Sequence, residues 1–182
     1  MKIANCKFQI SNLRFFILLA FGASLFAADA PTTTPAALKE MVGKPLRIAG
    51  TTVDGKALNT ESYTERVVII DFWATWCGPC VEELPHLKDV YEKYHDKGLE
   101  VIGVSNDFKI DALKKFLAAH PDYAWPQLFD PQAAKDQEMH SVTTQLGIES
   151  IPVMIILDKK GVVRSVEGAK DMDEMIPKMV KE

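Results

Sequence analysis

The sequence predicts one α/β domain in which helices cover a central β-sheet. Two observations support this prediction. Short runs rich in β-branched residues alternate along the chain with longer segments whose apolar residues recur at helical spacing. The chain has 182 residues, of which 47% are hydrophobic, and this suits one compact core better than two.

The first predicted elements are a hairpin, a buried strand and a long helix. Residues 46–53 and 56–58 flank Asp54–Gly55, a dipeptide that favours a tight hairpin turn. Residues 67–73 form an apolar run interrupted by an aspartate, which is typical of a strand buried on both faces. A long helix ending near Gly98 is expected next. Its apolar positions recur at helical spacing and are Val81, Leu84, Leu87, Val90, Tyr91 and Tyr94.

The middle of the chain continues this alternation. Residues 99–104 predict a second strand, and the apolar spacing over residues 110–117 predicts a second helix. Asp130–Pro131 is typical of a helix start, with Asp at the N-cap and Pro at the first helical position. We expect that helix to run to Leu146 and to end at Gly147.

The chain is predicted to end in a hairpin and a helix. Residues 153–157 and 162–166 are apolar runs joined by Asp-Lys-Lys-Gly, which places glycine where a bulged turn needs it. The last helix has a methionine-rich apolar face that we expect to fill the core. Its members are Met172, Met175, Ile176, Met179 and Val180.

The N-terminal segment has the composition of a secretory signal peptide. Basic residues precede the uncharged stretch 15–28, and small residues end that stretch. It is several residues short of the ~20 that a membrane span needs. We therefore expect residues 1–27 to be a signal peptide, residues 28–42 a linker and residues 43–182 the folded domain. The protein would be periplasmic and soluble after cleavage, and membrane-bound only if the segment were retained as an anchor.

The number and spacing of the cysteines limit the kinds of site that the chain can form. If Cys6 leaves with the signal peptide, Cys77 and Cys80 remain, in a C-x-x-C spacing. Exported proteins meet an oxidising compartment in which disulfides persist. So small a loop stabilises a fold little, and a structural zinc site would need four ligands. We therefore expect a redox-active pair and no metal.

Charge and histidines indicate no further site. The formal net charge is −4 at pH 7 and the sequence pI is about 5.6. Because there is no basic footprint, a nucleic acid is not an expected partner. We expect His86 and His140 to be solvated helix residues.

Residues 71–80, with the sequence DFWATWCGPC, resemble the active-site strand and turn of the thioredoxin superfamily. Pro85, Ile151–Pro152 and Gly168 resemble the kinking proline, the cis-proline loop and the late glycine of that family. The long stretch before the cis-proline loop, and the motif Glu83–Pro85, resemble its exported TlpA-like branch. The resemblance covers the whole predicted domain. It implies a thioredoxin fold with a central mixed β-sheet, an N-terminal β-hairpin and a helical insert before the cis-proline loop.

The resemblance also implies a two-step thiol–disulfide exchange. Cys77 would be the attacking thiolate at a helix N-terminus, where free N–H groups and the helix dipole lower the pKa of a thiol. Cys80, one turn further, would be the resolving thiol that breaks the mixed disulfide. Asp71 matches a buried acid of thioredoxins and would act as the general base for Cys80. Many TlpA-like proteins carry asparagine there, so Asp107 is a second candidate acid, with a helix cap as its alternative role.

Substrate contacts are expected around the cysteine pair. Trp76 precedes the first cysteine, Gly78 and Pro79 separate the two, and Trp73 is expected in the core. The backbone of Ile151, before Pro152, would pair with an extended substrate segment as an edge strand does.

The dipeptide between the cysteines, Gly78–Pro79, matches the reducing members of the family. We therefore expect a protein-disulfide reductase. The resemblance implies a role in cytochrome c maturation, with a more general exported thiol reductase as the alternative. The alternatives are a disulfide oxidase or isomerase on the same fold, or a copper-binding chaperone, although such chaperones use C-x-x-x-C with a distant histidine. A peroxiredoxin is disfavoured because the pattern P-x-x-x-T-x-x-C is absent at Cys77. We expect a monomer whose partners are protein disulfides and an upstream thiol donor, and whose dithiol needs no cofactor.

Overall fold

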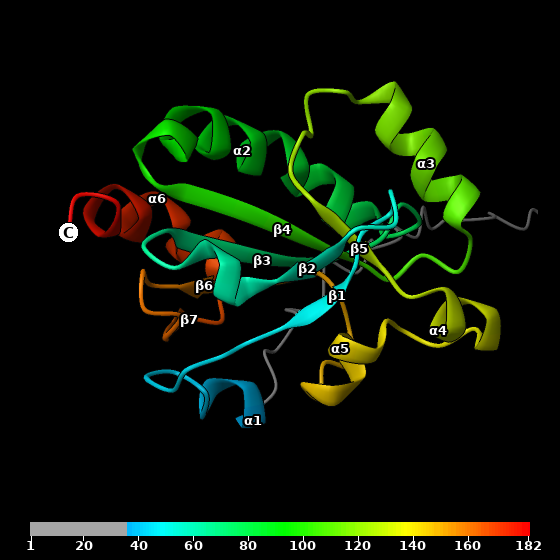
Figure 1. The fold of residues 1–182 in the computed structure, drawn as a ribbon, viewed down its shortest axis with the longest axis horizontal. Coiled ribbons are helices and arrows are strands. Elements are labelled where there is room, and N and C mark those ends of the chain that lie inside the picture. Colours follow the sequence, from blue (N-terminus) through cyan, green and yellow to red (C-terminus); the bar gives the residue numbers. More distant parts are fainter. Residues whose placement is uncertain (1–35) are drawn as a thin grey trace, which may run out of the picture. The chain divides into compact units, whose positions relative to one another are not determined.

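The computed structural model describes residues 36–182, so the expected signal peptide lies outside the described residues. Within that range a sheet of five strands runs in the order β5-β4-β3-β6-β7 (Figure 1). The central strand β3 (Val67–Trp73) is parallel to β4 (Leu99–Ser105) and antiparallel to β6 (Val153–Leu157). At the edges, β5 (Gln127–Phe129) is parallel to β4, and β7 (Val163–Ser165) is antiparallel to β6. The predicted α/β class with a mixed sheet is confirmed.

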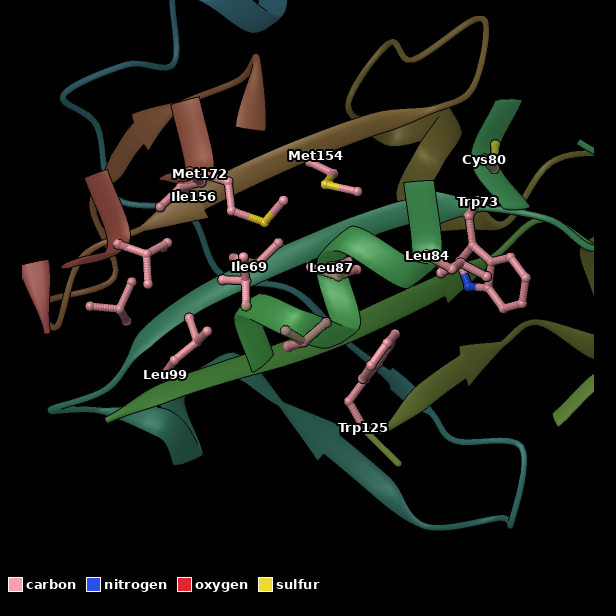
Figure 2. Packing of buried hydrophobic residues seen from close by; sticks show 14 of the residues in the cluster. Ile69, Trp73, Cys80, Leu84, Leu87, Leu99, Trp125, Met154, Ile156 and Met172 are labelled. Atoms are coloured by element: carbon pink, nitrogen blue, oxygen red, sulfur yellow. The ribbon is translucent and has the colours of Figure 1, made fainter. Parts of the chain in front are cut away.

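All seven residues of β3 are buried because helices cover both faces of the sheet. Successive side chains of a strand point to opposite faces. Val67, Ile69 and Trp73 belong to one core cluster, together with residues of α2 (Gly78–Tyr94) and α6 (Gly168–Met179). Figure 2 shows Ile69 and Trp73 with Leu84 and Leu87 of α2 and Met172 of α6.

The opposite face of β3 meets a different set of helices. Val68, Ile70 and Phe72 pack with Leu38 of α1 (Ala36–Lys39) and with Val142 of α5 (Ser141–Gln145). The short helix α1 lies in the segment expected to be a linker, and its Leu38 is completely buried.

The long helix α2 ends as predicted. A 3-10 turn, η2 (His95–Lys97), follows it, and Gly98 has a φ of 100°, which is the left-handed conformation that glycine adopts without strain. Helix α3 (Ile110–Ala119) agrees with the second predicted helix, and its Leu113 packs in the same core cluster as α2.

The hairpin near the N-terminus is confirmed, with shorter strands than predicted. It consists of β1 (Ala49–Thr51) and β2 (Ala57–Asn59), and Gly55 between them has a φ of 84°. Asn59 then caps a 3-10 turn, η1 (Thr60–Tyr63).

The prediction of one helix from Pro131 to Leu146 is wrong. The segment forms two short helices, α4 (Pro131–Asp136) and α5 (Ser141–Gln145). Helix α4 ends because Gln137 adopts a left-handed φ of 59°. His140 then begins α5 by accepting a hydrogen bond from the N–H of Val142.

His140 is therefore not the solvated side chain that we expected. It is 4% exposed, and burial lowers its pKa.

Strand β5 was also not predicted. Over residues 36–182, we find no helix long and apolar enough to cross a membrane.

Candidate active site

The two cysteines lie where β3 passes into α2. Cys77 is the N-cap residue of α2, and its Sγ accepts a hydrogen bond of 3.3 Å from the N–H of Cys80. The pair forms a disulfide. Cys77 is 6% exposed and Cys80 is 2% exposed. Because N–H groups at the start of a helix are free to bind an anion, this position stabilises a thiolate on Cys77 once the disulfide is reduced.

The loop before β6 lies against the first cysteine. The Sγ of Cys77 is 3.8 Å from the carbonyl oxygen of Ile151, and the Ile151–Pro152 peptide bond is cis, as the resemblance implied. Both loop residues are only partly buried. Gly78 and Pro79, between the cysteines, are exposed.

Asp71 is buried in the middle of β3. Its side chain is 1% exposed, and its Oδ2 has no hydrogen-bond partner. Burial raises the pKa of Asp71 to about 8, and the nearby carboxylate of Glu83 contributes to the rise. By strand alternation Asp71 lies on the face of Ile69 and Trp73, which is the face that packs with Cys80. The site therefore holds a carboxyl group that can gain or lose a proton near neutral pH.

Glu83 is a second carboxyl group in this region, and our sequence analysis did not single it out as a site residue. It lies three residues after Cys80 on α2, so the two side chains share one side of the helix. Its Oε2 is buried without a hydrogen-bond partner, and burial raises the pKa of Glu83. The i,i+3 spacing from a cysteine in the motif is the sequence signal that would have found it.

Asp107 lies after β4 and holds the turn that precedes Cys77. Its two carboxylate oxygens accept hydrogen bonds from the N–H of Thr75 at 3.1 and 3.2 Å, and Oδ1 also accepts from the Thr75 hydroxyl at 2.6 Å. The hydroxyl of Ser105 donates to Oδ2 at 2.9 Å. Asp107 is 3% exposed. The alternative role as a helix cap is wrong, because α3 begins after Lys109.

The two tryptophans of the motif have opposite surroundings. Trp73 is 1% exposed, as expected for a core residue, and its Nε1–H donates to the Oε1 of Gln127 at 2.9 Å. Trp76 is 52% exposed and stacks on Phe108, with ring centroids 5.6 Å apart and 4° between the ring planes. Phe108 was not among the predicted site residues, because only the folded chain brings the two loops together.

Within residues 36–182, no group of three or more His, Cys, Asp and Glu side chains is placed to hold a metal ion. The chemistry in this part of the chain rests on a dithiol at a helix N-terminus, a buried carboxyl group with a raised pKa and a cis-proline loop. The fold and these groups define a thiol–disulfide oxidoreductase with a thioredoxin fold.

Comparison with known proteins agrees with this class. The model of the AhpC/TSA family matches residues 42–166, which is more than half of the chain, so the chain belongs to this family. The thiol-disulfide oxidoreductase ResA of Bacillus thuringiensis subsp. konkukian is 27% identical over 126 residues, covering 69% of this chain and 68% of the relative. The thioredoxin-like protein YneN of Bacillus subtilis is 28% identical over 131 residues, covering 70% of this chain and 72% of that protein.

Solved structures show the same likeness. A structure from Chlorobium tepidum, described as a thiol:disulfide interchange protein DsbE, superposes with a TM-score of 0.64 and 26% identity. The match covers 77% of this chain and 97% of that chain. The resemblance to thioredoxin-like thiol–disulfide oxidoreductases that the motif indicated is thus confirmed at the level of family and fold.

Proposed function

We propose that this protein is an exported disulfide reductase in which Cys77 attacks the substrate and Cys80 resolves the intermediate. The observation that supports the proposal most is the placement of Cys77 at the N-cap of α2, with Cys80 buried one turn further. The Gly78–Pro79 pair between the cysteines supports the reducing direction. Export rests on the composition of residues 1–27.

In the first step, the thiolate of Cys77 attacks one sulfur of a protein disulfide. The substrate S–S bond breaks, a mixed disulfide forms on Cys77, and the second substrate sulfur leaves as a thiolate that takes up a proton. Trp76, Gly78, Pro79 and the Ile151–Pro152 loop are the proposed contacts for the substrate segment around that disulfide.

In the second step, Cys80 loses its proton and attacks the Sγ of Cys77. The mixed disulfide breaks, the substrate sulfur that was bound to Cys77 leaves as a thiolate and takes up a proton, and the enzyme is left as the Cys77–Cys80 disulfide. Asp71 is the proposed acceptor of the Cys80 proton. With a pKa of about 8, a fraction of its carboxyl groups is ionised near neutral pH, and that ionised form takes up the proton. Two electrons have then passed to the substrate, and an upstream thiol donor returns the enzyme to its dithiol form.

The substrate class follows from the proposed location. A periplasmic reductase acts on exported proteins whose cysteines must be kept reduced. By the resemblance to the TlpA-like branch, apocytochrome c cysteines awaiting haem attachment are one such class. We expect the protein to act as a monomer.

The reduction potential of the cysteine pair tests the direction. The protein is equilibrated with mixtures of reduced and oxidised dithiothreitol while tryptophan fluorescence is recorded, with a Cys77→Ser variant as the control that cannot form the disulfide. A potential of about −230 mV or lower supports a reductase with its own electron donor. A potential of about −120 mV contradicts the reductase proposal and indicates an oxidase.

A further inference from the structure

Exposed apolar side chains gather beside the cysteine pair. Among the residues that the structure describes, the exposed large hydrophobic side chains are Val42, Trp76 and Phe108, with exposed fractions of 48%, 52% and 40%. Two of these three stack on each other in parallel, 5.6 Å apart. We call the faces of Trp76 and Phe108 that remain open to solvent the Trp76–Phe108 surface. An exposed aromatic pair at a reactive group is typical of a surface that binds a partner.

The backbone on both sides of this surface is held firmly. Thr75, which precedes Trp76, donates both its N–H and its hydroxyl to Asp107, which precedes Phe108. Asn106 is tied to the same strand end, because its N–H donates to the carbonyl oxygen of Trp73 at 2.8 Å. The backbone that carries the two stacked rings is therefore held in place, so little backbone freedom is lost when a partner binds.

The surface adjoins the group that reacts. Trp76 is the residue before Cys77, and the Sγ of Cys77 is 3.8 Å from the carbonyl oxygen of Ile151. Cys77 is only 6% exposed. Residues that flank a substrate sulfur at Cys77 therefore come close to the surrounding surface.

We propose that the Trp76–Phe108 surface binds an apolar or aromatic side chain next to the attacked cysteine of a protein disulfide. Asp107 is the positioning residue that holds the two loops together. This inference rests on the proposed attack by Cys77. It implies that the enzyme selects disulfides in extended segments with an apolar flanking residue, and that small polar disulfides are poorer substrates.

Two disulfide peptides test this preference. They are identical except that the residue beside the attacked cysteine is phenylalanine in one and serine in the other, and 2-hydroxyethyl disulfide serves as a small substrate without flanking residues. The full chain is reduced, and kcat/KM is measured for each substrate. Stacking and burial of one ring predict a preference for the phenylalanine peptide of roughly tenfold in the wild type.

Phe108→Ala should reduce that preference to about twofold or less, since it removes half of the aromatic surface. Val42→Ala is the matched control, because it removes an equally exposed apolar side chain from another part of the molecule, and it should keep the preference. The absence of a preference in the wild type, or its persistence in Phe108→Ala, would overturn the proposal. A change in oligomeric state on Phe108→Ala without a change in preference would also overturn it, since the surface would then be an interface between two copies.

The small disulfide separates this inference from the proposed function. If the wild type reduces 2-hydroxyethyl disulfide through Cys77 but shows no peptide preference, the surface proposal fails and the function proposal stands. If the wild type reduces none of the three substrates, the proposed function itself fails.

Discussion

The buried acid Asp71 should make the stability of the oxidised protein fall as the pH rises from about 4 to 8. The pKa of its carboxyl group is about 8 in the folded protein, against an ordinary value of 3.8. Between these values the unfolded chain has lost the proton while the folded protein still holds it. Unfolding therefore releases a proton, and a higher pH favours the unfolded state.

The magnitude follows from the size of the pKa difference. Each unit corresponds to ~1.4 kcal/mol, so about three units at pH 7 give a loss of ~4 kcal/mol relative to pH 4. Asp71→Asn has no proton to lose and should lack this dependence. An unpartnered amide at this site costs ~1–3 kcal/mol at every pH, so the slopes, not the absolute stabilities, are compared.

The assay is urea denaturation of the disulfide form at several pH values from 4 to 9, because in that form neither cysteine titrates. We expect the difference in unfolding free energy between the wild type and Asp71→Asn to change by ~1.4 kcal/mol per pH unit up to about pH 8, and to level off above it. Glu83→Gln is the control for the second carboxyl group. A difference that stays constant from pH 5 to 7 would refute the view that burial keeps Asp71 protonated.

The same Asn variant tests the proposed proton transfer. If Asp71 accepts the proton of Cys80, Asp71→Asn should slow the second step roughly 100-fold, the lower end of what a general base contributes. The mixed disulfide on Cys77 should then accumulate in single-turnover reactions that are quenched with acid and analysed by mass spectrometry. An unchanged rate of resolution would exclude Asp71 from this role.

Two further substitutions test the packing around the site. Gly168→Ala would place a Cβ 2.6 Å from the Cβ of Met154 and should lower the unfolding free energy by ~1–3 kcal/mol. The Cβ of Gly78→Ala meets no heavy atom within 4 Å, so this control should change the unfolding free energy by no more than ~0.5 kcal/mol. Equal effects in urea denaturation would contradict the crowding at Gly168. Thr75→Val removes the hydroxyl that binds Asp107 and should cost ~1–3 kcal/mol, while Thr75→Ser should retain most of the stability. If the Ser variant lost as much as the Val variant in the same assay, the hydroxyl would not be the group that matters.

The parts of the fold that could be predicted are those encoded over short distances in the chain. The apolar run of residues 67–73, interrupted only by Asp71, predicted a strand buried on both faces, and every residue in it is buried. The position of Gly98 predicted the end of the first long helix, because a left-handed residue is the usual stop. The motif around Cys77 identified the strand-to-helix passage. In each case the signal and the structure lie within one short stretch of the chain.

The errors arose where a distant contact decides the local structure. The spacing of Ala133, Ala134 and Val142 is compatible with one helix, but the first helix ends at Gln137. The break allows the N–H of His140 to donate to the Oδ1 of Asn106 at 3.0 Å, a contact between residues 34 positions apart. No pattern of neighbouring residues predicts such a contact.

Strand β5 was missed for a related reason. It has only three residues, and it is a strand because it pairs with β4, with Val104 opposite Leu128. The stack of Trp76 on Phe108 likewise depends on two loops that are neighbours only in the folded chain.

The register of the sheet brings the site together. Trp73 lies opposite Ser105 in the parallel pair of β3 and β4, so both strands end at one edge, and Thr75 and Asp107 each follow by two residues. Phe72 lies opposite Val153 in the antiparallel pair, so the cis-proline loop enters at that same edge. A one-residue slip of β4 would move every side chain of that strand to the other face and separate Asp107 from Thr75. The sheet is mixed: β4 ends where β3 ends, and β6 begins there. This topology therefore places the positioning residue Asp107 on one side of Cys77 and the loop of Ile151 on the other.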